Sequence, residues 1–250
     1  MRQRGRVCHS AQGSQSAGFC LTELLVALAI GTVVIAMAFQ VVTNLEGRFR
    51  VQHRGMALEQ DARLGLAVFE QEVLSATVDA VDGSVLRRAD SSTLEFLANV
   101  NGQDTVLTAA ALVGQLDLSV QDGSDWQEGK QVRICGLGRC WQNRLARDGQ
   151  RSRLALAIPL SETVPAGTTV SVVNEVRYYV LPGARGTFRF MRQIDGGANT
   201  LIGDLRAVSL TYRDRFGRAT VDPQTVATVR LQMSVGDERR RVLQEVGLRT

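Results

Sequence analysis

The chain has few of the side chains that catalysis and metal binding require. Its 250 residues include two histidines and four cysteines, and no G-x-S-x-G, phosphate-loop or His-Glu-x-x-His motif is present. Residues 121–125 lack the alternating ligands and terminal glutamate of an EF-hand, so we expect a turn there. We therefore predict a protein that is not an enzyme and that needs no cofactor and no metal ion.

Lysine is also nearly absent, because all but one of the 29 basic residues are arginine. The arginines cluster at positions 87–88, 144–153 and 239–241, and acidic residues are interleaved with these clusters. Three of the basic residues lie within the first six positions, so the net charge of +4 is partly a property of the N-terminus. Solvation of the surface explains this pattern better than binding to nucleic acid does.

No proline precedes Pro159, and no charged residue lies between Leu24 and Leu45. A helix of about 20 apolar residues crosses a hydrocarbon core of about 30 Å, so residues 24–42 are long enough to span a membrane. Apolar residues then recur at helical spacing as far as Ala76. We expect one helix from Phe19 to near Asp79 that is apolar on all sides in its first half and amphipathic in its second.

Two simpler interpretations of the apolar run remain. Ala36-Met37-Ala38 has the small-x-small pattern of a signal-peptidase site, and a plain single-span anchor has the same composition as this run. The helical pattern continues past Phe39, which disfavours a signal peptide. Arginines ahead of the run place the N-terminus in the cytoplasm and the remainder of the chain across the membrane.

The junction before the run reads Gly18-Phe19-Cys20-Leu21-Thr22-Glu23. A lone carboxylate in hydrocarbon is unfavourable by about 2.5–3.5 kcal/mol on insertion scales, so Glu23 needs a functional reason. Residues 18–42 resemble the N-terminal motif of the type IV pilin and pseudopilin family. This resemblance implies that prepilin peptidase cleaves between Gly18 and Phe19 and that the new N-terminus, Phe19, is methylated. It also implies that Glu23 pairs with the N-terminal ammonium of a neighbouring subunit, which makes both charges less costly to bury.

Within that family, the chain is more similar to minor subunits than to major ones. Major pilins typically carry a proline in the apolar half and often end in a wide disulfide loop, and this chain has neither. Residues 58–67 and the ending at 242–249 are similar to PilW-type minor pilins. The J-type pseudopilins of type II secretion share much of the pattern, so both remain alternatives.

The remainder of the chain shows the alternation of apolar and polar residues that is typical of half-buried strands. It predicts two hairpins, formed by residues 175–181 with 187–194 and by residues 229–235 with 241–248. Shorter strands are expected at 93–98, 131–134, 154–158, 168–172 and 207–212. We predict an α+β fold with a cleaved leader (1–18), a helix (19–82, with about 19–45 in the membrane or filament core) and a head (83–250). As the resemblance implies, this is a pilin-like arrangement in which the helix packs on a largely antiparallel sheet.

Cys135 and Cys140 are separated by four residues, two of which are glycine. Zinc would need a second Cys or His pair that the chain lacks, and a redox pair usually has two intervening residues. A disulfide is therefore favoured if the head lies outside the cytoplasm. Trp126 and Trp141 lie on either side of this region, where core packing is favoured over an exposed contact surface.

The family resemblance leads to one combined expectation. The chain would be a minor pilin that initiates or caps a type IV pilus, held first in the inner membrane by one helix with its head in the periplasm. Its partners would be prepilin peptidase, the inner-membrane assembly machinery, and other major and minor pilins. The alternatives are a J-type pseudopilin of a type II secretion system and, in the binding class, a pilus-borne adhesin or DNA-uptake subunit. Nucleic acid is not the expected partner.

Overall fold

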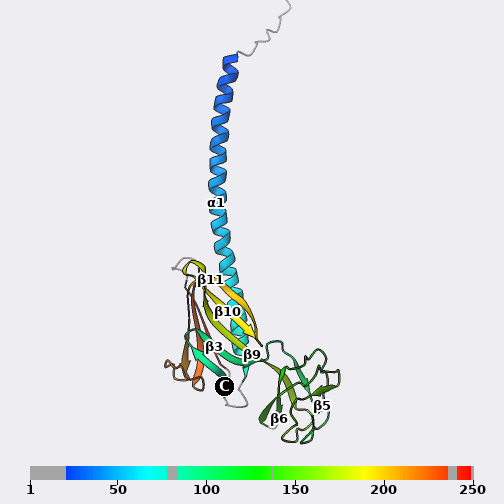
Figure 1. Cartoon of the computed structure of the whole chain (residues 1–250). Coiled ribbons are helices and arrows are strands. Elements are labelled where there is room, and N and C mark those ends of the chain that lie inside the picture. The colour runs from blue at the N-terminus through cyan, green and yellow to red at the C-terminus, as the bar shows by residue number, and fades with distance from the viewer. Residues whose placement is uncertain (1–20, 78–83, 137, 236–240, 249–250) are drawn as a thin grey trace, which may run out of the picture. The chain divides into compact units, whose positions relative to one another are not determined.

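The computed structural model describes residues 21–77, 84–136, 138–235 and 241–248. The chain divides into two compact units, residues 1–54 and residues 55–250. Helix α1 (Leu21–Leu74) begins in the first unit and ends in the second (Figure 1). The expected long apolar helix is therefore present, and an antiparallel sheet accounts for most of the second unit.

Helix α1 ends earlier than the apolar pattern predicted. The hydroxyl of Ser75 donates to the carbonyl oxygen of Glu72 at 2.8 Å and closes the last turn. Ala76, which was expected on the helical stripe, belongs instead to strand β1 (Ala76–Thr77) and pairs with Ala98. The prediction of a helix to near Asp79 was wrong because backbone pairing with the sheet takes over directly after Ser75.

The strands of the second unit pair only in antiparallel fashion among the described residues. The main sheet runs in the order β1, β3 (Thr93–Ala98), β9 (Thr169–Pro182), β10 (Phe188–Ile194), β11 (Gly197–Asp214), β12 (Val226–Val235) and β13 (Arg241–Gly247). Strand β2 (Leu86–Asp90) pairs with β3, and a short 3₁₀ helix (Ala184–Gly186) connects β9 to β10. The sheet curls, so that β11 comes close to the turn that follows β2. There the backbone N–H of Leu210 in β11 donates to the carbonyl oxygen of Ser91 at 3.1 Å.

The second half of α1 supplies one wall of the main core. Ala62, Leu66, Phe69 and Val73 recur at steps of three or four and are all buried. The ring of Phe69 meets Tyr178 of β9 edge to face, with 5.0 Å between ring centroids. Each large apolar side chain buried in this way stabilises the fold by about 1.5–3 kcal/mol. These helix residues belong to the same hydrophobic core as the inward-facing residues of the sheet.

Gly65 allows α1 to approach β11 closely. A Cβ atom at this position would lie 2.4 Å from Cγ1 of Ile202, a separation that real side chains do not tolerate. A glycine inside a helix is unfavourable by about 1 kcal/mol relative to alanine. The close packing of the helix against β11 gives a structural reason for accepting that cost.

A second hydrophobic core lies in residues 104–172, which we call the inserted lobe because they lie between β3 and the rest of β9. Its strands are β4 (Asp104–Val106), β5 (Asp117–Ser119), β6 (Gln131–Gly136), β7 (Arg139–Arg144) and β8 (Arg153–Ala155). Trp126, Leu118 and Leu154 are among its fully or nearly fully buried side chains. The sequence did not predict this separate core.

Strand β9 connects the two cores (Figure 1). Its first half pairs with β4 and β6, and its second half pairs with β3 and β10. Val170 and Val172 belong to the core of the inserted lobe, whereas Val176 and Tyr178 belong to the main core. The segments 168–172 and 175–181, expected as two strands, are therefore one strand.

Most other strand predictions are confirmed, with changed bounds in several cases. Both predicted hairpins are present, as β9 with β10 and β12 with β13. Strand β3 has the predicted bounds, β6 extends to Gly136, and β11 extends well beyond residues 207–212 on both sides. Strand β8 covers Arg153–Ala155 only, so the predicted strand 154–158 was too long. The α+β class is thus confirmed.

Candidate functional site

The first candidate site is the N-terminal part of α1. Gly18 and Phe19, the expected cleavage and methylation positions, lie outside the described residues. Glu23 lies in the first turn of the helix and is exposed. All residues from 21 to 50 except Gly31 are also exposed, and Phe39 is exposed to 69%.

This helical segment has the composition and length of a membrane span. Its hydroxyl groups are satisfied internally, since Thr32 donates to the carbonyl oxygen of Ala29 at 2.8 Å and Thr43 donates to that of Phe39 at 3.0 Å. Its apolar side chains are exposed on all sides of the helix and need lipid or other helices around them. Glu23 is the one acidic group at the beginning of this surface.

The second candidate site is a buried ionic cluster in which the helix meets the sheet. Glu72 of α1 accepts a hydrogen bond from the hydroxyl of Tyr178 on β9. The Nε of Arg192 on β10 donates to both carboxylate oxygens of Glu72, at 2.9 and 3.1 Å, and its Nη2 donates to Oε1. The side chains of Glu72 and Arg192 are 6% and 21% exposed, so the pair is largely removed from water.

The protonation states of this cluster follow from its surroundings. Burial, and then the negative charge of Glu72, raise the pKa of the Tyr178 hydroxyl far above its usual value, so the hydroxyl remains a donor. The hydrogen bond to Glu72 raises the pKa of Arg192, which stays charged. The cluster therefore fixes the last turns of α1 on β9 and β10 through polar groups that pair with one another.

The third candidate site joins the inserted lobe to the main sheet. Lys130, the single lysine of the chain, donates from Nζ to Asp195 Oδ2 at 2.6 Å. Asn174, which is 1% exposed and lies between the two halves of β9, donates to the same oxygen at 2.8 Å. Burial alone would raise the pKa of Asp195, but these two hydrogen bonds and one from the backbone N–H of Glu175 outweigh it and lower the pKa.

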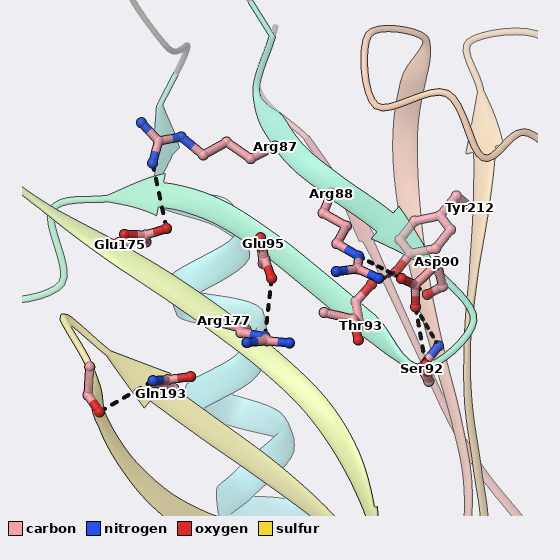
Figure 2. A network of polar contacts seen from close by, with 11 residues as sticks. Arg87, Arg88, Asp90, Ser92, Thr93, Glu95, Glu175, Arg177, Gln193 and Tyr212 are labelled. Atoms are coloured by element: carbon pink, nitrogen blue, oxygen red, sulfur yellow. Dashed lines mark hydrogen bonds and ion pairs between the residues drawn. The ribbon is translucent and has the colours of Figure 1, made fainter.

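The outer face of the sheet carries a row of ion pairs, shown in Figure 2. Glu95 on β3 and Arg177 on β9 are direct cross-strand partners, 3.0 Å apart. Arg87 lies 3.6 Å from Glu175, and Arg88 contacts Asp90 at 2.7 Å. This face is therefore charged but balanced.

The turn between β2 and β3 is held from outside its own hairpin. Asp90 accepts hydrogen bonds from the backbone N–H and the hydroxyl of Ser92, at 3.0 and 3.1 Å. Tyr212 of β11 donates to the carbonyl oxygens of Asp90 and Thr93, at 2.8 and 3.0 Å (Figure 2). These contacts fix the position at which the sheet curls.

Cys135 and Cys140 form a disulfide, as expected. They are directly opposite one another in the hairpin of β6 and β7, so the disulfide joins two paired strands. Trp126 lies in the core of the inserted lobe, as predicted, and Trp141 is half-buried against it. Residues 121–125 form a turn in which the backbone N–H of Ser124 donates to Asp122 at 2.9 Å. Within the described ranges, no cluster of His, Cys, Asp and Glu is arranged to hold a metal ion.

Several arginines from the clusters noted in the sequence lie in ion pairs. Arg147 and Arg153 both contact Asp117, at 3.2 Å each, and Arg88 contacts Asp90. Of the third cluster, only Arg241 is described, and it is exposed. The positive charges of these paired arginines are each balanced by a carboxylate.

Sequence reasoning did not find the Glu72 cluster or the junction at Asp195. Glu72 and Arg192 are 120 positions apart, and each resembles an ordinary surface residue of an amphipathic element. The pattern offered one weak signal, because Glu72 directly precedes Val73, which lies on the buried stripe of the helix.

Comparison with known proteins yields no relative. No family model matches the chain, and neither the curated proteins nor the solved structures contain a match. The fold and the three sites are therefore the basis for assigning a function.

Proposed function

We propose that this chain is a structural subunit of a type IV pilus-type filament, processed by prepilin peptidase and acting as a minor pilin in initiation or capping. The observation that carries this proposal is the combination of one acid, Glu23, with the apolar and exposed helix surface that follows it. Such a surface is stable in a bilayer and also in a bundle of like helices, which is what a subunit extracted from the membrane into a filament needs.

Glu23 has a specific role in this proposal. Its carboxylate pairs with the methylated N-terminal ammonium at Phe19 of a neighbouring subunit, and it sets the register between the two helices. A carboxylate and an ammonium that face one another are far less costly in an apolar medium than either charge alone. The head remains in the periplasm until assembly, and the inner-membrane machinery and other pilins are the partners.

The test separates processing from assembly. Glu23→Ala should leave cleavage after Gly18 intact, as seen in the mass of the mature N-terminus, but should abolish incorporation into filaments. Glu46→Ala is the matched control, because Glu46 is an exposed acid on the same helix that pairs with Arg50 at 3.1 Å. Gly18→Leu should block cleavage itself.

Three results would contradict the proposal. Normal assembly of the Glu23→Ala protein would remove the pairing role. An uncleaved chain would identify a plain membrane anchor, and a mature chain beginning at Phe39 would identify a signal peptide.

The alternatives differ in phenotype. For a J-type pseudopilin, loss of the chain abolishes type II secretion and leaves pili intact, whereas for a minor pilin the reverse is expected. A DNA-uptake role is less supported, because Arg88, Arg147 and Arg153 from its arginine clusters lie in ion pairs with carboxylates. Salt-sensitive DNA binding by the intact chain would favour that role instead.

A further inference from the structure

Strand β13 is an open edge of the main sheet. It is the last strand in the order of the sheet, and within the described ranges only β12 pairs with it. All seven of its residues, from Arg241 to Gly247, stay in unbroken register with β12. Bulges, prolines and very short strands protect such edges from pairing with another chain, and β13 has none of these.

Alternate residues of β13 direct their backbone hydrogen-bonding groups away from β12. The N–H of Leu248, just after the strand, donates to the carbonyl oxygen of Ala227 at 2.8 Å. Residues two positions apart in an antiparallel ladder face the same neighbour, so the even-numbered residues of β13 bond to β12. Arg241, Leu243 and Glu245, which we call the edge residues, therefore direct their N–H and C=O groups to the open edge.

The side chains of the edge residues lie on the face of the sheet that is turned away from α1. On the same strand, Gln244 donates to Glu70 of the helix at 3.0 Å, and Val246 is buried in the main core. Because side chains alternate between the two faces of a strand, the edge residues face the other way. All three are exposed, and Leu243 is exposed to 53%.

The charged edge residues have capacity for a further partner. Both bonds from Arg230 of β12 to Glu245 use one carboxylate oxygen, Oε2, which lies 3.1 Å from Nε and 2.6 Å from Nη2. The other oxygen, Oε1, accepts no hydrogen bond from any residue in the described ranges, and no described carboxylate pairs with Arg241. One free cation and one half-used anion thus lie on either side of an exposed leucine.

We propose that β13 pairs with β13 of a second copy of this chain, antiparallel, about a two-fold axis at Leu243. In this register Leu243 faces its own counterpart, and Arg241 of each copy faces Glu245 of the other copy. The three facing pairs would exchange about six backbone hydrogen bonds and join the two sheets into one. A contact of one short strand is small, so the dimer should be reversible and depend on protein concentration.

The pattern of the edge residues specifies this occupant and this register. Parallel pairing would bring each charge beside its own kind, and like charges next to one another destabilise a sheet. A shift of two residues in either direction would place Leu243 opposite Arg241 or Glu245. Of these arrangements, only the antiparallel one centred on Leu243 matches apolar with apolar and each charge with its opposite. The strand is therefore complementary to a second copy of itself.

Cysteine cross-linking of the full-length chain in detergent micelles tests the register. In a Cys8→Ser, Cys20→Ser background, Leu243→Cys places two thiols on backbones about 5.5 Å apart across the axis, within reach of a disulfide. Gly247→Cys is the matched control on the same strand and face, because a Cβ atom there meets nothing within 4 Å. Its two copies would lie about 27 Å apart. Under mild oxidation, Leu243→Cys should give about tenfold more linked dimer than Gly247→Cys.

Exchange of the charges tests the complementarity. Added to Leu243→Cys, Arg241→Glu brings two glutamates together and should lower the yield of dimer about tenfold. Glu245→Arg, combined with Arg230→Glu to keep the pair within the chain, brings two arginines together and should lower the yield equally. A mixture of these two variants pairs opposite charges at both positions. The mixture should restore the dimer, and mass spectrometry should show that it contains one chain of each kind.

Four outcomes would overturn the proposal. Absence of cross-linking by Leu243→Cys would exclude a second copy as the occupant of the edge. Equal cross-linking by Gly247→Cys would mean association without register, for example through α1. Undiminished cross-linking of either charge variant alone, or a mixture that restores no dimer, would remove the role of the charges. Neither the proposal nor its test depends on processing at Gly18, so it can fail independently of the proposed filament function.

Discussion

Removing one partner from the Glu72 cluster should destabilise the second unit strongly. In Glu72→Leu, Arg192 loses its carboxylate and Tyr178 loses its acceptor, and both remain largely buried. Breaking a buried ion pair in this way typically costs about 3–5 kcal/mol. For a unit of this size, 1 kcal/mol shifts the melting temperature by about 2–4 °C, so Glu72→Leu should melt about 6–20 °C lower.

The double variant Glu72→Leu with Arg192→Met provides the sharper test. Replacing both charges by apolar groups of similar volume removes the uncompensated charge and is often neutral or stabilising in other proteins. The double variant should therefore recover much of the loss, and the two substitutions should couple by several kcal/mol in a double-mutant cycle.

Thermal and denaturant unfolding of the intact chain in micelles measures these effects. The matched control is Glu59→Leu with Arg63→Met, which removes an exposed pair on the same helix with a 3.1 Å contact and side chains 44% and 78% exposed. Exposed pairs contribute about 0–1 kcal/mol, so its effect should be small. If Glu72→Leu were no more harmful than this control, the cluster would not hold the helix on the sheet.

Two further predictions concern the junction at Asp195, which joins the inserted lobe to the main sheet, and the disulfide inside the inserted lobe. Asp195→Asn should cost about 1–2 kcal/mol at pH 7, because hydrogen bonds to a charged group are lost. The folded-state pKa of Asp195 is lowered, so its contribution is complete above about pH 4 and disappears as pH falls through that lower pKa. The difference between variant and unaltered chain in denaturant unfolding should accordingly shrink in acid, and a constant difference would contradict this role. Replacing both Cys135 and Cys140 by serine opens a short loop (sequence separation 5) and should cost about 2 kcal/mol. Hydrogen exchange should localise this loss to β6 and β7, and faster exchange in β12 and β13 would be inconsistent with two separate cores.

The elements that could be predicted are those whose signal is local. A long apolar run without proline specifies α1, and the alternation of apolar and polar residues over positions 229–235 specifies most of β12. The disulfide follows from two cysteines in an otherwise cysteine-poor head. In each case, neighbours in the sequence carry the information.

The inserted lobe could not be predicted in the same way. Strands β4, β5 and β8 have three residues each, which is too short for a periodicity to be visible. Its turns include Asp125, whose φ of 64° is not expected of a residue other than glycine. The junction at Asp195 combines residues from three distant segments, so no single window contains it.

The first unit exposes many more large apolar side chains than the inserted lobe does, which implies a longer-lived contact with its partners. Fifteen large apolar side chains are exposed between Leu21 and Phe49, whereas in the inserted lobe Leu112, Val113 and Ile158 are each 63% exposed. Burial of each contributes about 1.5–3 kcal/mol, so the helix gains tens of kcal/mol in lipid or a bundle. Burial of those three would contribute less than about 9 kcal/mol, which is comparable to the free energy lost on association, about 4–15 kcal/mol. The helix therefore requires permanent partners, whereas those three side chains alone do not hold a partner permanently.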